Sequence, residues 1–169
     1  MKKFTDKILI CLLLLVSISA LAIAFGAQFI FGLEPCILCN YQRIPYFSVI
    51  LFAGLALHIE SADRSGIAKA IGVIFLTGAA LAFYHSGVEQ HWWEAATSCG
   101  SSGVDLSSFQ DFQTQLLIKM PKACDQIDWT LFDLSMTVYN TFASLAFAAL
   151  SFFGTFLIRK LYSVDHLEN

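Results

Sequence analysis

Four long stretches of this chain contain no Asp, Glu, Lys or Arg and consist mainly of apolar residues. A helix needs about 20 apolar residues to cross a bilayer, and the stretch at 44–59 reaches that length only if its helix starts earlier and ends at Glu60. The stretches lack the sustained apolar–polar alternation of a β-barrel, so they predict an all-α membrane protein, a four-transmembrane-helix bundle in one domain, residues 1–169. The predicted spans are about 8–33, 42–60, 69–87 and 137–158, with outer loops at about 34–41 and 88–136.

The first stretch admits a second interpretation, a cleaved signal peptide. The chain starts with the basic residues Lys2 and Lys3, and the small residues at 20–22 resemble a cleavage site. However, the apolar run continues to Leu33, well past the roughly 7–15 residues that a signal peptide uses. This length favours a retained membrane helix.

The composition supports a membrane protein and excludes two other classes of protein. Apolar residues make up 57% of the chain and charged residues only 14%, against roughly 25% charged in soluble proteins. So much apolar surface excludes a disordered chain. A net charge of -3 without a basic cluster excludes a typical nucleic-acid binder.

Basic residues set the expected orientation, because Lys and Arg are enriched in cytoplasmic loops. If both termini are cytoplasmic, the inner segments hold 7 of the 10 basic residues. These are Lys2, Lys3, Lys7, Arg64, Lys69, Arg159 and Lys160. We therefore expect a multi-pass membrane protein with both termini in the cytoplasm.

The five cysteines are unevenly placed. Cys11 lies inside the first predicted span, where we interpret it as a small buried apolar residue. Cys36, Cys39, Cys99 and Cys124 all fall on the predicted outer side, which is the oxidising side in a bacterium. Thiols there tend to pair, so these four are the candidate reactive cysteines.

Cys36 and Cys39 form a C-x-x-C motif, which occurs in redox, zinc and haem proteins. Haem attachment requires His directly after the second Cys, where this chain has Asn40. The four outer cysteines could hold zinc, although zinc sites usually bring two close pairs, and Cys99 and Cys124 are 25 residues apart. A structural membrane subunit whose loops carry inert disulfides is the third interpretation. The spacing favours a redox pair and leaves the other two open.

The residues after the motif favour a reactive Cys39. Pro45 is best tolerated in the first turn of a helix, which places the start of the second span near Gln42 or Arg43. A helix start carries partial positive charge and lowers the pKa of a nearby thiol. Arg43 adds a full charge, although a lone Arg at a helix end is often an interfacial anchor. His85, at the outer end of the third span, is a further candidate site residue.

The long outer loop has one readable element, a short amphipathic helix at about 108–121 that would lie on the bilayer. Its apolar residues share one helical face, and Pro121 marks its end. Cys99 precedes this helix within a run of Ser and Gly, and Cys124 follows it. The helix would hold both cysteines near the membrane surface, with Cys99 accessible to another protein.

Together these motifs resemble the DsbB family of bacterial inner-membrane disulfide-forming proteins. The likeness extends over nearly the whole chain. It is carried by the string Pro-Cys-Ile-Leu-Cys-Asn-Tyr-Gln-Arg at 35–43, the Tyr84-His85 pair, the spaced Cys99 and Cys124, and the sequence at 134–140.

The resemblance implies a quinone-dependent thiol-disulfide oxidoreductase. Such a protein reoxidises a periplasmic DsbA-like thioredoxin-fold partner and passes the electrons to ubiquinone or menaquinone in the membrane. By position, a Cys99–Cys124 disulfide would oxidise the partner through a mixed disulfide on Cys99. Cys124 would then pair with Cys36 and leave Cys39 as a thiolate against the quinone ring.

The resemblance also implies two quinone-binding residues beside Cys39. Arg43 would stabilise the thiolate and the quinone, and His85 would lie near the quinone. Asn40 and Gln42 lie where polarity can differ between family members, which leaves the choice of quinone open. No metal is implied for this chemistry.

Overall fold

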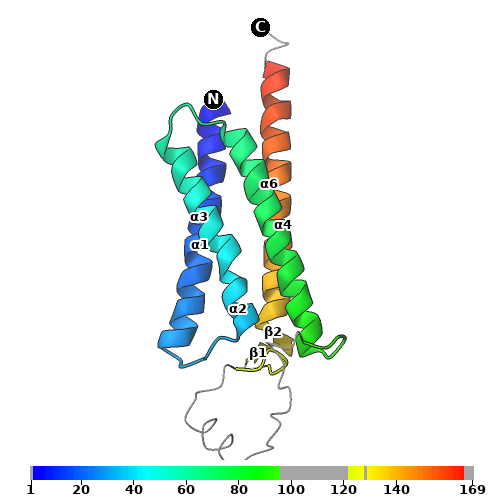
Figure 1. Cartoon of the computed structure of the whole chain (residues 1–169). Helices are drawn as coiled ribbons and strands as arrows, with labels where there is room; N and C mark the ends of the chain where they lie inside the picture. The colour runs from blue at the N-terminus through cyan, green and yellow to red at the C-terminus, as the bar shows by residue number, and fades with distance from the viewer. Residues whose placement is uncertain (1, 96–121, 128, 166–169) are drawn as a thin grey trace, which may run out of the picture.

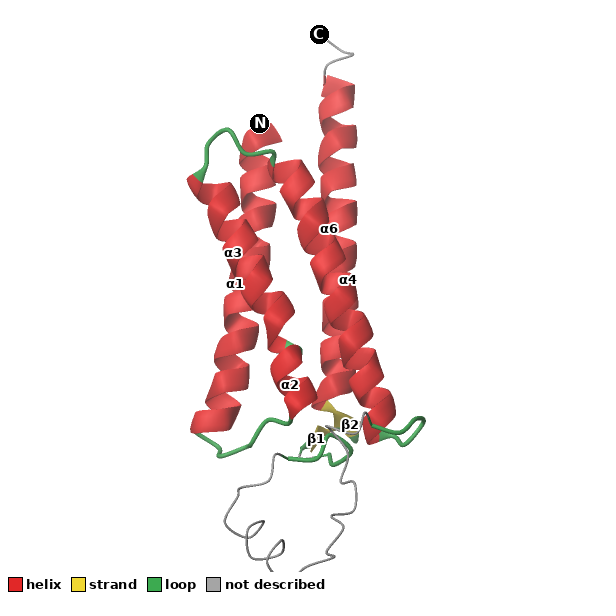
Figure 2. Ribbon diagram, in the orientation of Figure 1, coloured by secondary structure: helices red, strands yellow, loops and turns green. Residues whose placement is uncertain are grey.

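The computed structural model describes residues 2–95, 122–127 and 129–165, which form a bundle of long helices with a small hairpin at one end (Figures 1 and 2). Its elements are α1 (Lys2–Phe29), α2 (Ile37–Tyr41), α3 (Arg43–His58), α4 (Arg64–Glu89), β1 (Thr130–Leu131), β2 (Leu134–Ser135) and α6 (Met136–Asp165). The start of α1 and the end of α6 lie at one end of the bundle, and α2 and the hairpin lie at the other (Figure 1). We name this second end the cysteine end, because Cys36, Cys39 and Cys124 lie there.

Among the described residues, three helical segments are long and apolar enough to cross a membrane: Thr5–Phe29, Arg64–Glu89 and Met136–Ile158. The remaining predicted span corresponds to α3, whose 16 residues extend about 24 Å, less than the about 30 Å of a typical hydrocarbon core. α2 precedes α3 with only Gln42 between them and lies toward the cysteine end (Figure 2). The described residues therefore contain three helices of membrane-spanning length, together with the shorter α3 and the five-residue α2.

Large apolar side chains cover the outside of these helices. Leu15, Phe142 and Phe153 are 61%, 67% and 67% exposed. Apolar surface on this scale marks contact with something other than water, and with helices of this length it indicates lipid. Cys11 shares this outer surface, so the prediction that it is buried is wrong.

Two local features differ from the sequence predictions. α1 ends at Phe29 rather than near residue 33, because Gly32 adopts a left-handed conformation (φ 69°) and Pro35 follows. A short hairpin that was not predicted precedes α6, and its turn residues Phe132 and Asp133 have φ of 49° and 61°. Positive φ at both central positions is what a two-residue type I′ turn requires. The predicted helix at 108–121 lies outside the described residues.

Apolar side chains from four helices form the core of the bundle, with Ala148 as the buried member from α6. Ile10 and Leu13 of α1, Val49 of α3, and Ile71 and Phe75 of α4 are all fully buried. Buried polar side chains within the bundle, such as Ser17 and Ser151, donate to backbone carbonyl oxygens of their own helices.

A glycine allows α3 and α4 to approach closely. A Cβ atom at Gly78 would lie 3.2 Å from Cβ and 3.3 Å from Cγ of Pro45. Small residues at such contacts are how membrane helices pack, because lipid provides no hydrophobic force between them. The contact holds the start of α3 against α4, next to the cysteine end.

We expect Gly78→Leu to destabilise the protein by about 1–3 kcal/mol, because the rigid ring of Pro45 leaves no room for a side chain. Gly54→Leu is the matched control, since a Cβ at Gly54 meets nothing within 4 Å. Unfolding in detergent, followed by circular dichroism, measures both variants. Equal unfolding midpoints for the two variants would contradict the close contact.

Candidate functional site

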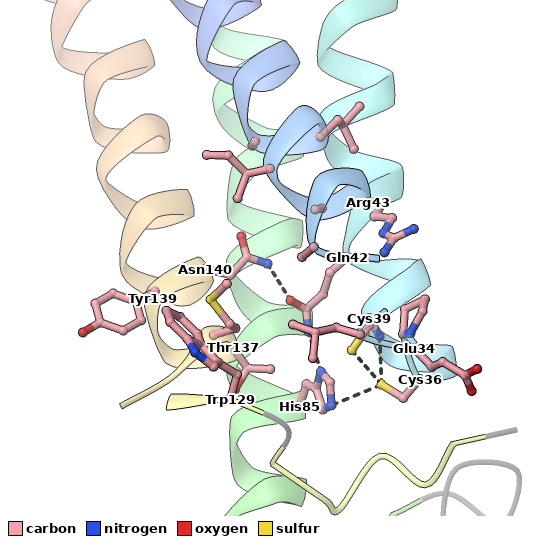
Figure 3. A pocket seen from close by; sticks show the side chains of 18 of the residues that line it. Glu34, Cys36, Cys39, Gln42, Arg43, His85, Trp129, Thr137, Tyr139 and Asn140 are labelled. Atoms are coloured by element: carbon pink, nitrogen blue, oxygen red, sulfur yellow. Dashed lines mark hydrogen bonds between the residues drawn. The ribbon is translucent and has the colours of Figure 1, made fainter. Parts of the chain in front are cut away.

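The cysteine end brings together side chains that are distant in the sequence. Cys36 and Cys39 come from the start of α2, and His85 comes from the last turns of α4. Figure 3 shows His85 and both cysteines pointing toward one another. Cys124 packs with Cys36 and Val88 in one buried apolar cluster. The structure thus gathers three of the four predicted reactive cysteines, whereas Cys99 lies outside the described residues.

The turn of α2 holds the Cys36 and Cys39 sulfur atoms side by side. Cys36 is the N-cap residue, and its Sγ accepts a hydrogen bond from the backbone N–H of Cys39 at 3.2 Å. The Cys36 thiol also donates to Cys39 Sγ across 2.8 Å. Both residues are reduced here. The pair is positioned so that a disulfide can form between its members with little movement of the backbone.

This hydrogen bond makes the two thiols unequal. The pKa of Cys39 is lowered, first because its sulfur accepts the Cys36 hydrogen bond, while burial opposes the change. The pKa of Cys36 is raised to about 12, first because its deprotonation would break the same bond and then by burial. Cys39 is therefore the member that forms a thiolate. The sequence also predicted a lowered pKa for Cys39, from the helix start and Arg43. In the structure the largest cause of the lowered pKa is the hydrogen bond from the Cys36 thiol.

Arg43 lies beside the site and contacts α1. Its Nη1 donates a hydrogen bond to Gln28 Oε1 at 2.7 Å, and its guanidinium lies 4.6 Å from the centre of the Phe25 ring. Arg43 and Cys39 also line the same cavity. The guanidinium is thus held at the edge of the site by contacts with α1.

His85 is the most connected polar side chain at the cysteine end, and only 1% of it is exposed. Its Nε2 lies 3.2 Å from the backbone carbonyl oxygen of Cys124 and 3.5 Å from Cys36 Sγ. Its Nδ1 lies 2.7 Å from the amide nitrogen of Gln42. Glu89, one turn further along α4, has Oε1 3.9 Å from Nε2.

A chain of polar groups runs from His85 into the bundle, and sequence reasoning missed it. Gln42 Oε1 accepts a hydrogen bond from Asn140 Nδ2 at 2.6 Å, as Figure 3 shows. Asn140 Oδ1 in turn accepts one from the Tyr46 hydroxyl at 2.5 Å. Gln42 and Asn140 both belong to the sequence motifs, at 35–43 and 134–140, on which the family resemblance is based. They are 98 residues apart, so no local sequence pattern predicts their contact.

A cavity of about 380 Å³ opens beside the thiol pair. Small side chains of α1, from Ala20, Ala24 and Ala27, line one side. The polar lining includes Cys39, Gln42, Arg43, His85 and Asn140. A largely apolar cavity with a few placed polar groups is typical of a site for a small organic ligand or cofactor.

The same side chains also include a possible metal-ligand set. The sulfur atoms of Cys36 and Cys39 and a ring nitrogen of His85 lie within 4.8 Å of one another. Thiolate and imidazole are the ligands that zinc prefers in proteins. This set differs from the four-cysteine site that the sequence left open, because it draws on His85.

The fold and the site define a helical membrane protein that holds a C-x-x-C thiol pair and a buried histidine at one end of its bundle. Comparison with known proteins identifies the family. The family described as Disulfide bond formation protein DsbB matches residues 6–154. The chain belongs to the DsbB family and is an oxidoreductase of disulfide bond formation in the bacterial inner membrane.

Individual relatives agree with this assignment. The Disulfide bond formation protein B of Xylella fastidiosa (strain Temecula1) is 35% identical over 138 residues, which cover 77% of this chain and 78% of that protein. The Disulfide bond formation protein B of Xanthomonas axonopodis pv. citri is 31% identical over 155 residues, 86% and 87% of the two chains. An uncharacterized protein of Rickettsia prowazekii is 30% identical over 145 residues, 82% and 81% of the two chains. No solved structure matches this chain.

We expect alkylation of the reduced protein to distinguish the two thiols by their pH profiles. Because only the thiolate reacts, Cys39 should reach its full rate at lower pH than Cys36, which should stay slow beyond the ordinary thiol value of 9.0. In Cys39→Ser the pKa of Cys36 should fall, because the serine hydroxyl cannot act as the thiolate acceptor.

Iodoacetamide labelling followed by peptide mass spectrometry measures both rates in a Cys11→Ser background, which removes the thiol on the outer surface of α1. A Cys36 rate that rises at lower pH than the Cys39 rate would refute this assignment.

Proposed function

We propose that this protein oxidises the dithiol of a periplasmic DsbA-like thioredoxin-fold protein and passes the two electrons to ubiquinone or menaquinone. The observation that carries the proposal is the position of Cys39, which lines a cavity whose α1 side is apolar. A quinone has a planar polar head and a lipid-soluble tail. The head suits the polar lining near Cys39 and Arg43, and the tail suits the alanine side of the cavity.

The proposed transfer begins at Cys99. A thiolate of the partner attacks the Cys99–Cys124 disulfide, forms a mixed disulfide with Cys99 and releases the Cys124 thiolate. The second partner thiol then attacks the mixed disulfide, which releases the oxidised partner and the Cys99 thiol. The partner has thereby given two electrons to the second cysteine pair of this protein.

The electrons then move to the membrane. The Cys124 thiolate attacks Cys36 of the oxidised Cys36–Cys39 pair, forms a Cys36–Cys124 disulfide and leaves Cys39 as a thiolate beside the quinone. The Cys99 thiolate then attacks Cys124, which restores the Cys99–Cys124 disulfide and releases Cys36 as a thiol. Oxidation of Cys36 and Cys39 back to their disulfide gives two electrons and two protons to the quinone. The buried contact between Cys124 and Cys36 and the lowered pKa of Cys39 support this order. In sum, partner dithiol and quinone become partner disulfide and quinol, so two electrons and two protons are transferred.

A quinone acceptor also suits the energetics. A DsbA-like protein is a strong oxidant, with a reduction potential of about -120 mV, so a disulfide that reoxidises it needs an electron sink beyond itself. The membrane quinone pool is such a sink. The distribution of Lys and Arg supports an orientation with the cysteine end on the periplasmic side, both termini cytoplasmic and α3 as a fourth span.

One alternative has a specific observation behind it, namely the three donors of Cys36, Cys39 and His85. A structural zinc site would give stoichiometric zinc in the purified protein and no quinone reduction. Inert loop disulfides would resist both mild reductant and a reduced DsbA-like protein. Metal analysis of the purified protein tests the zinc alternative. Treatment with mild reductant and with a reduced DsbA-like protein tests the inert-disulfide alternative.

We expect Cys39→Ser to abolish quinone reduction, because the donor thiolate is lost. Arg43→Ala should slow it by about ten- to a hundredfold, the effect of losing one hydrogen bond to a charged group. Lys69→Ala is the control. It also removes one positive charge, but near the start of α4 and far along that helix from His85, and it should have no effect. Quinone absorbance during anaerobic titration with a reduced DsbA-like protein measures all three. Full activity in Cys39→Ser would dispose of the mechanism.

We expect Cys99→Ser to stop oxidation of the partner, because no sulfur remains for the mixed disulfide. A partner whose second cysteine is replaced by serine should instead accumulate a mixed disulfide with Cys99 of the wild-type protein, because no partner thiol is left to release it. Non-reducing gel electrophoresis detects this adduct. If the adduct forms through another cysteine, the proposed order of transfer is wrong.

A further inference from the structure

We propose that Gln42, held by Asn140 and Tyr46, is a positioning residue that keeps the ring hydrogen of His85 on Nε2. The proposal rests on the direction of the hydrogen bonds around His85. It goes beyond the proposed electron transfer, because it assigns His85 one chemical form and states which residues impose that form.

The contact between His85 and Cys124 fixes which groups donate and which accept in this series of hydrogen bonds. His85 Nε2 lies 3.2 Å from the backbone carbonyl oxygen of Cys124, and a carbonyl oxygen can only accept. Nε2 must therefore carry hydrogen. In a neutral imidazole the other nitrogen, Nδ1, is then an acceptor.

Each further link follows from the one before. Because Nδ1 accepts, Gln42 turns its NH₂ group toward it at 2.7 Å, and its Oε1 faces Asn140. Asn140 must then donate through Nδ2, which leaves its Oδ1 to accept from the Tyr46 hydroxyl. The phenol can donate, so each of these hydrogen bonds joins one donor to one acceptor.

The opposite arrangement of donors and acceptors is unfavourable at the contact between His85 and Cys124. Reversing both amides would place Gln42 Oε1 on a hydrogen at Nδ1 and leave a lone pair on Nε2. That lone pair would face the lone pairs of the Cys124 carbonyl oxygen at 3.2 Å. His85 is 1% exposed and Gln42 8% exposed, so such a mismatch would occur where water cannot relieve it.

This tautomer decides what His85 can do for the thiol pair. With hydrogen on Nε2, His85 presents a donor to Cys36 Sγ at 3.5 Å. A nitrogen that carries hydrogen cannot ligate a metal, so the Cys36, Cys39 and His85 set lacks its third ligand. In metal sites the ligating His usually donates the N–H of its second ring nitrogen to a carboxylate or carbonyl. In His85 that nitrogen would be Nδ1, and the Gln42 NH₂ group opposite it is a donor that cannot accept this hydrogen bond. Gln42 therefore keeps a redox thiol pair from becoming a metal site.

Nitrogen NMR of the full-length reduced protein in lipid nanodiscs tests the tautomer directly. With ¹⁵N-labelled histidine, and His85 assigned by the signal lost in His85→Asn, we expect Nε2 to be protonated and Nδ1 not. Gln42→Glu replaces the amide donor by an acceptor, so Nδ1 should become protonated. Protonated Nδ1 in the wild type, or an unchanged tautomer in folded Gln42→Glu, would overturn the proposal.

Cadmium binding provides the second measurement. Titration of the anaerobic reduced proteins with Cd²⁺, followed by thiolate-to-metal charge-transfer absorbance, should show at least about tenfold tighter binding in Gln42→Glu than in the wild type. Gln90→Glu makes the same change at an exposed position and should bind as the wild type does. Adding His85→Asn to Gln42→Glu should abolish the gain. Equal affinities for wild type and Gln42→Glu would contradict the protective role.

Asn140→Asp is a second variant for the same test, to be used if the buried carboxylate in Gln42→Glu prevents folding. Asn140 is only partly buried, and an aspartate there cannot donate to Gln42, so the Gln42 amide should reverse and Nδ1 of His85 should become protonated. An unchanged tautomer in folded Asn140→Asp would overturn the assigned role of Gln42. The NMR result does not depend on quinone reduction, so failure of the proposed function would leave it standing.

Discussion

The cysteine end depends on one buried imidazole whose two nitrogens are both in use. His85 comes from α4, and its partners come from the start of α2, from the residue between α2 and α3, and from the segment at 122–127. A buried polar group left without a partner costs about 1–3 kcal/mol, so these segments cannot shift independently of the ring. The ring thereby fixes Cys124 next to Cys36, although the two residues lie in different loops.

The surrounding helices make this arrangement rigid. Five residues of α2 would not form a stable helix alone, since isolated helices shorter than roughly 12–15 residues are marginal in water. α2 is held because Leu38 is buried beside Cys36, and because α3, which follows almost directly, packs on α4 where Gly78 meets Pro45. The hydrogen bond between the two thiols therefore depends on helix packing as well as on the C-x-x-C spacing.

The sequence predicts much of this molecule because membrane helices and metal or redox motifs leave local signals. Charge-free stretches predicted the long helices, and Pro45 predicted a helix start near Gln42 or Arg43, where α3 begins at Arg43. The end of α1 was missed because the apolar run continues past the point where Gly32 turns the chain. The Gln42 to Asn140 link could not be predicted, because a contact across 98 residues depends on how α3 and α6 pack.

Tyr46 marks the boundary between the polar end and the apolar core. Its hydroxyl donates to Asn140, while its ring packs edge-on against Phe75 with the ring centres 5.8 Å apart. Phe75 in turn packs on Phe147 at 5.4 Å, so the next layer of the bundle is apolar. Polar atoms deeper in the bundle would need partners that lipid cannot supply. The hydrogen-bond chain can therefore end at Tyr46 without leaving the Asn140 amide unsatisfied. In the proposed electron transfer, this boundary keeps the thiol pair at the membrane edge, where it would meet both a water-soluble protein and a lipid-soluble acceptor.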